Sequence, residues 1–85
     1  MNIDEKIHAA MGRVLDEASA AQSVYGNYAS MHEAYGVLAE EVAELFDGVR
    51  MRQNDPERAK AIGREAIQVA AVALRIAAQA DEVTR

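Results

Sequence analysis

The chain has 85 residues, which is enough for one domain spanning residues 1–85. A domain this small buries only about three-fifths of the surface that its unfolded chain exposes, and without cysteine it has neither a disulfide nor a thiolate metal site to stabilise it. The formal net charge of -5 argues against nucleic acid as a partner, because direct binding to a phosphate backbone needs a cationic surface, so any phosphate ligand would need a metal ion as mediator.

The first predicted helix covers residues 3–22. Asn2 followed by Glu5 has the form of a capping box, and apolar residues then recur at helical spacing. The opening "MNIDEKIHAA" has acidic residues where a signal peptide has a basic patch and an apolar run. We therefore predict no export signal and a cytoplasmic protein.

The second predicted helix covers residues 31–52 and follows a connection containing Gly26 and Asn27, which tolerate the backbone conformations of turns. Ser30 with Glu33 forms another capping box. The helix has two contrasting sides, because its acidic residues and its apolar residues fall on opposite arcs. The acidic arc contains Glu33, Glu40, Glu44 and Asp47, the apolar arc contains Leu38, Val42, Leu45 and Val49, and Glu41 lies at the boundary.

The third predicted helix covers residues 56–82. Asp55 before Pro56 is typical of a helix start, since the carboxylate can accept N–H groups and the proline needs no hydrogen-bond partner. This helix is apolar on nearly all sides, which indicates the buried element of the fold. Its apolar tract "AIQVAAVALRIAAQA" is too short to cross a bilayer, so no membrane span is predicted.

Only residues 53–55 separate the second and third predicted helices, and so short a link predicts an antiparallel hairpin. Residues equally far from the turn should then lie side by side, which pairs Glu44 with Glu65 and Glu41 with Gln68. The predicted fold class is all-α: a three-helix chain with an antiparallel hairpin that assembles as an oligomeric helical bundle. Many alanines and a thin core favour a homodimer or homotetramer.

Glu65 shares a helical stripe with Val69 and Val72, so its carboxylate should face the packed interior. One explanation is a salt bridge, for which basic partners are available in Lys60, Arg64 and Arg75. The other is a shared cation, because grouped carboxylates repel one another unless a hard divalent ion such as Mg²⁺ or Mn²⁺ binds between them. The acidic arc taken alone is also compatible with a solvated helix face.

Two segments, "EEVAEL" at Glu40–Leu45 and "EAIQ" at Glu65–Gln68, together resemble the EExxE…ExxD signature of the MazG-like all-α nucleotide pyrophosphohydrolases. The resemblance covers about half of the chain, residues 32–75. It implies a Mg²⁺-dependent enzyme, with Mn²⁺ as an alternative ion, that cleaves nucleoside triphosphates between the α and β phosphates. Monophosphate and pyrophosphate would be the products.

Carried over by position, the resemblance implies that Glu41, Glu44, Glu65 and Gln68 are the metal-binding positions. Glu40 and Glu44 would act as catalytic carboxylates, with Glu40 a ligand or a water-positioning residue. The departure is Gln68, because the family has aspartate there and an amide offers an oxygen without charge. Three outcomes follow: weakened activity, compensation by a nearby acid, or a fold retained for binding alone.

Weaker candidates for substrate binding are His32, at the start of the second helix, and two basic residues of the third helix, Lys60 and Arg64. Each has a simpler explanation as an exposed surface residue. The leading hypothesis is the pyrophosphohydrolase. Its alternatives are a catalytically weakened nucleotide- or metal-binding helical oligomer of the same fold, and a helical oligomerisation protein whose acids are surface charge.

Overall fold

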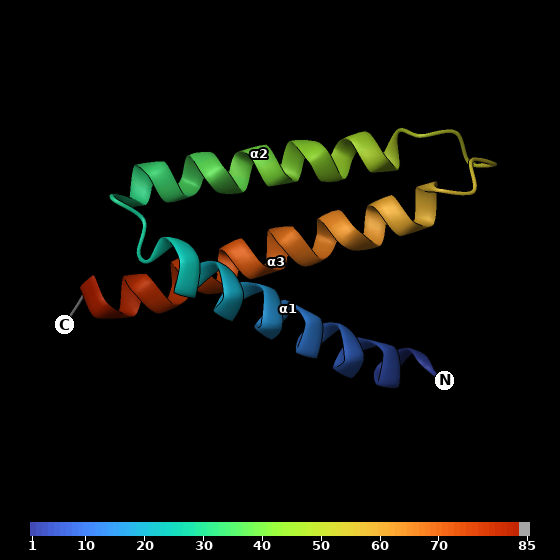
Figure 1. The fold of residues 1–85 in the computed structure, drawn as a ribbon. Helices are drawn as coiled ribbons and strands as arrows, with labels where there is room; N and C mark the ends of the chain where they lie inside the picture. Colours follow the sequence, from blue (N-terminus) through green and yellow to red (C-terminus); the bar gives the residue numbers. More distant parts are fainter. Residues whose placement is uncertain (84–85) are drawn as a thin grey trace.

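The computed structural model describes residues 1–83 as three helices without a strand among them: α1 (Ile3–Tyr25), α2 (Met31–Val49) and α3 (Arg58–Val83). The all-α prediction is confirmed for this part of the chain. In Figure 1, α2 runs antiparallel to α3, whereas α1 runs in the same direction as α3 and diverges from it toward the N-terminus. None of the three helices combines the length and apolar character needed to span a bilayer.

Both predicted capping interactions are present. The side chain of Asn2 accepts the backbone N–H of Glu5 at 2.9 Å, and the Ser30 hydroxyl accepts the N–H of Glu33 at 3.0 Å. Each bond satisfies an amide group that the first turn of a helix leaves without a partner. At its other end α1 stops at Gly26, whose φ of 68° is a conformation that residues with a side chain rarely adopt.

The turn between α2 and α3 is longer than predicted. It covers residues 50–57, because α2 ends at Val49 and α3 begins at Arg58. The guanidinium of Arg58 donates to the carbonyl oxygen of Val49 at 3.0 and 3.3 Å and so binds the end of α2. The Asp55 carboxylate accepts the N–H of Glu57 at 2.8 Å, as predicted for a residue before a helix start. Both helices are shortened by similar amounts, so the expected pairing across the hairpin is kept.

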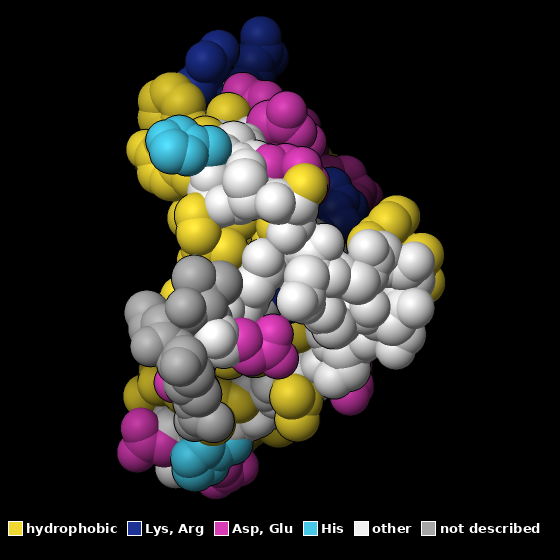
Figure 2. All heavy atoms as spheres, turned by 90° about the vertical axis from the view of Figure 1, so that its left-hand side faces the viewer, with side chains coloured by type: hydrophobic (Ala, Val, Ile, Leu, Met, Phe, Trp, Pro, Cys, Tyr) yellow, Lys and Arg dark blue, Asp and Glu magenta, His cyan; other side chains and the backbone are white. Residues whose placement is uncertain are grey.

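Helix α3 is the centre of the fold, because within residues 1–83 it packs against both other helices, while the backbones of α1 and α2 do not pack against each other. The buried core is small and contains no large aromatic side chain; its apolar members are Ala18, Ala34, Ile67, Ala71 and Val72. Large hydrophobic side chains of all three helices consequently remain exposed, and Figure 2 shows hydrophobic side chains at the surface of one face of the molecule.

The face of α2 that packs on α3 differs from the predicted apolar arc. Its fully buried residues are Ala34 and Gly48, and Glu41 lies midway between them at seven-residue spacing. Val42 and Val49 of the predicted apolar arc are exposed instead. Small residues suit this face, because a Cβ at Gly48 would already be in van der Waals contact with the backbone of Ala61 and Ile62, which leaves no room for a larger side chain. Glu41 therefore lies in the seam between α2 and α3. The sequence had predicted it at the boundary between the acidic and apolar arcs of the helix.

Candidate metal centre

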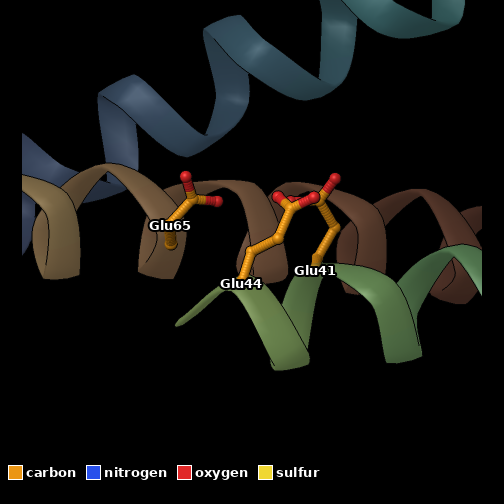
Figure 3. A group of neighbouring side chains, drawn as sticks. All are labelled: Glu41, Glu44 and Glu65. Atoms are coloured by element: carbon orange, nitrogen blue, oxygen red, sulfur yellow. The ribbon is translucent and has the colours of Figure 1, made fainter. Parts of the chain in front are cut away.

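Three carboxylates converge where the two hairpin helices face each other. Glu41 and Glu44 extend from α2 and Glu65 from α3, and one oxygen of each lies within 4.8 Å of the others. Figure 3 shows the three side chains reaching to the same side of the two helices. The expected meeting of Glu44 with Glu65 is confirmed. We call Glu41, Glu44 and Glu65 the carboxylate trio.

The trio is only partly open to water. The Glu65 side chain is 17% exposed, Glu41 is half-buried, and Glu44 is exposed. Oxygen Oε2 of Glu41 is shielded from solvent and has no hydrogen-bond partner in the described chain. A buried charged oxygen without a partner is costly, and it is the kind of atom that a cation satisfies.

The environment raises the pKa of the Glu41 carboxyl above its ordinary value of 4.5. Burial is the largest cause, followed by the negative charges of Glu44 and Glu65, a hydrogen bond to the Glu44 side chain that only protonated Glu41 can donate, and the charge of Glu40. Each of these effects disfavours the ionised form of Glu41. Without a cation, the pKa shift means that Glu41 keeps its proton to a higher pH than an ordinary glutamate does.

This shift predicts how stability without metal depends on pH. Above the ordinary value of 4.5 the unfolded chain releases the Glu41 proton while the folded chain retains it, so the folded state binds more protons. In a chelating buffer, the Glu41 contribution to stability should therefore fall as pH rises from about 4.5 and level off above the raised pKa. Thermal melts of the wild type and Glu41→Gln between pH 4.5 and 7.5 check this, and parallel curves would contradict it.

Arg64 is the basic neighbour of the trio. Its Nε lies 3.4 Å from Oε1 of Glu65, but its side chain is 60% exposed. An ion pair this open to water contributes little and cannot balance three carboxylates. Arg75, another partner considered for Glu65, donates instead to Gln22, Gly26 and Tyr28. A salt bridge alone thus does not account for the grouping.

The other predicted site residues take separate positions. Glu40 lies exposed on α2, outside the trio, and Lys60 is exposed one turn before Arg64 on α3. His32 is exposed in the first turn of α2, which places it about 13 Å along the helix axis from Glu41. Gln68 shares a cavity of about 350 Å³ with Glu41, as the predicted pairing of these two residues requires.

Glu17 also lines this cavity, and the sequence analysis assigned no role to it. Its Oε2 accepts a hydrogen bond of 3.1 Å from the Gln68 amide, so α1 brings a further acid next to Glu41 and Gln68. No motif marked Glu17, because the position of α1 depends on the connection before α2. A polar cluster attaches that connection to α3: Arg75 donates to the Tyr28 hydroxyl at 3.0 Å, and Gln79 binds the Tyr28 backbone at both N and O.

A second hollow of about 340 Å³ lies on the other side of the trio. Its lining includes Glu44, Asp47, Arg64 and Glu65. The carboxylates thus lie between a cavity lined by all three helices and a second hollow whose wall includes one arginine. An oxygen-only donor set of this kind suits Mg²⁺ or Mn²⁺.

No protein-family model matches the chain, and comparison with curated proteins and with solved structures finds no significant match. The resemblance to the MazG-like enzymes therefore depends on the two motifs and on the position of their residues in the hairpin.

Proposed function

We propose that the protein is a Mg²⁺-dependent nucleoside triphosphate pyrophosphohydrolase that cleaves between the α and β phosphates to give a monophosphate and pyrophosphate. The observation that supports this most is the carboxylate trio, because residues from the two halves of the quoted signature meet within 4.8 Å. The proposal also explains how a chain of net charge -5 can bind a polyanion.

In this proposal Glu41, Glu44 and Glu65 bind the ion, and the unpartnered Oε2 of Glu41 is the atom most in need of it. Gln68 would add a neutral oxygen. A bound divalent ion supplies charge neutralisation on the triphosphate and lowers the pKa of a coordinated water. The side chains around the ion would determine where the substrate and the water molecule lie.

The exposed carboxylates are the ones suited to proton transfer, because water reaches them directly. Glu44 combines exposure with membership of the trio, and Glu40 is exposed one position before Glu41. Either can accept a proton from a water molecule between the trio and the phosphates. Arg64, at the edge of the trio, and Lys60, one turn away, would contact phosphate oxygens in this proposal.

The cavity beside Glu41 offers space for the nucleoside. Val37, Ala71 and Val72 supply apolar lining, and Tyr25 and Glu33 also contribute to its wall. Apolar lining with a few polar groups is typical of small-molecule sites. His32, which precedes Glu33, would lie toward this end of the substrate.

The test is to incubate the pure protein with canonical and modified nucleoside triphosphates, with Mg²⁺ or with chelator, and to measure monophosphate and pyrophosphate separately. Metal-dependent formation of both products in equal amounts supports the proposal. Release of inorganic phosphate would indicate a different cleavage position. No product from any triphosphate would overturn the enzymatic proposal.

A second candidate function, binding of metal or nucleotide without efficient turnover, is favoured by Gln68. Its amide nitrogen donates to Glu17, and the residue carries no charge at the position where the resembling family has aspartate. Calorimetric titration with Mn²⁺ separates this candidate from a helical oligomer whose acids are only surface charge, since that protein should bind no ion at the trio.

Gln68→Asp is expected to tighten Mn²⁺ binding by about tenfold or more, because a charged oxygen replaces a neutral one beside Glu41. The dissociation constant from calorimetry checks this. Gln53→Asp, an equal charge change at an exposed position in the turn, should leave affinity within about twofold because it is screened by solvent. Equal affinities for Gln68→Asp and the wild type would remove Gln68 from the metal-binding set.

A further inference from the structure

Helix α1 exposes its large apolar side chains. Four of them recur every four residues on one stripe and are between 51% and 70% exposed: Ile3, Ile7, Met11 and Leu15. The face of α1 that packs on α3 has smaller residues, including Val14, Ala18 and Ala21. In a monomeric protein, the largest apolar side chains of a surface helix normally face the core. The exposed stripe therefore indicates a second packing partner.

The stripe borders an apolar groove of about 930 Å³ between α1 and α3, which we call the α1–α3 groove. Small residues that line it, such as Ala10 and Ala73, leave room for a side chain from outside. Large residues that line it, such as Met11 and Leu74, are exposed and can fill such room in another molecule. A surface with both features can pair with itself, as a two-fold symmetric interface requires.

The exposed area of the chain supports the same conclusion. The protein exposes 6292 Å², whereas a compact monomer of its mass exposes roughly 4,900 Å². The excess is roughly 1,400 Å² per chain, and a stable protein interface buries about 800 Å² on each partner. The excess is thus more than large enough to supply one such interface with a second copy of the chain.

We propose that the α1–α3 groove binds the same surface of a second copy of this chain, so that two α1 helices pack against each other across a two-fold axis. A competing apolar stripe lies on α2 and contains Tyr35, Val42, Phe46 and Val49. The groove is the better self-docking surface, because within residues 1–83 α1 packs less extensively on α3 than α2 does, and because the groove combines large with small apolar side chains. The interface needs neither metal nor nucleotide, so it stands apart from the proposed enzymatic activity.

The test is the mass of the full chain in solution, measured by sedimentation over a range of concentrations in chelating buffer. The wild type should be at least dimeric. Met11→Glu should weaken association by at least about a hundredfold, because it places a charge in an apolar contact. Ala9→Glu, an equal change on the opposite side of α1, should leave the mass unchanged.

Three results would overturn the proposal: a monomeric wild type, which would leave the groove to a different protein; a Met11→Glu variant that associates normally; or a dimer that only Val42→Glu dissociates.

If the Met11→Glu chain fails to fold, an introduced thiol tests the proposal instead, because the protein has no cysteine of its own. The thiol introduced by Met11→Cys should react with maleimide at least tenfold more slowly at high than at low protein concentration. Ala9→Cys should react equally fast at both, and equal rates for Met11→Cys would also overturn the proposal.

Discussion

The Glu41→Gln variant is expected to lose metal-dependent triphosphate hydrolysis by at least about a hundredfold, since changes even to the outer partners of metal ligands cost about 10- to 100-fold. Glu41 is one of the two half-buried members of the trio, and its Oε2 has no partner among the described residues. The amide keeps the size of the side chain but removes its charge. Metal affinity should fall together with turnover.

The same variant should be more stable than the wild type in the absence of metal. Glu41 is disfavoured in its ionised form by burial and by Glu44 and Glu65, and the neutral amide removes both costs. In chelating buffer at pH 7.5 its melting temperature should therefore exceed that of the wild type. Saturating Mg²⁺ should reverse the order, because only the wild type gains stability from bound metal.

Glu57→Gln is the matched control, since it makes the same chemical change at an exposed position outside the trio. It should retain activity, and its melting temperature should stay close to that of the wild type with and without Mg²⁺. Full activity in Glu41→Gln would remove Glu41 from the metal site. A stability loss in chelator would show that the carboxylate has a favourable partner in the folded protein.

The Arg75→Ala variant is expected to lower the free energy of unfolding by about 2–4 kcal/mol, which is large for a domain of this size. The guanidinium donates three hydrogen bonds, to Gln22, Gly26 and Tyr28, and lies 4.5 Å from the centre of the Tyr28 ring. Its loss leaves part-buried acceptors without a donor and removes a cation–π contact. Urea unfolding at fixed protein concentration measures the change.

Arg13→Ala is the control for this prediction, because it removes an exposed arginine from another helix and should change stability by about 0.5 kcal/mol or less. Arg75→Lys should recover only part of the loss, since an ammonium group cannot reproduce the planar fork of donors. An Arg75→Ala variant as stable as Arg13→Ala would show that the connection before α2 is positioned by its backbone alone. Full recovery by lysine would assign the stabilisation to charge.

Several features were predictable from the sequence because they depend on local interactions. Asn2 and Ser30 marked the starts of α1 and α2, because a capping side chain and the amide it accepts are only three residues apart. The pairing of Glu44 with Glu65 was also predictable, since the turn shortened α2 and α3 by similar amounts. The position of the turn itself was not, because Arg58 binds the end of α2 from across the loop.

The amino-acid sequence by itself determined three helices, the antiparallel hairpin and the two halves of the carboxylate trio, because each depends on neighbours along the chain or on a short turn. Only the tertiary structure decided that Glu41 lies in the helix seam, since this depends on the close approach that Ala34 and Gly48 allow. The same holds for Glu17 beside Gln68 and for the exposed stripe of α1. The physical reason is that helical periodicity identifies the sides of a helix, whereas the packing of small residues against α3 selects which side is buried.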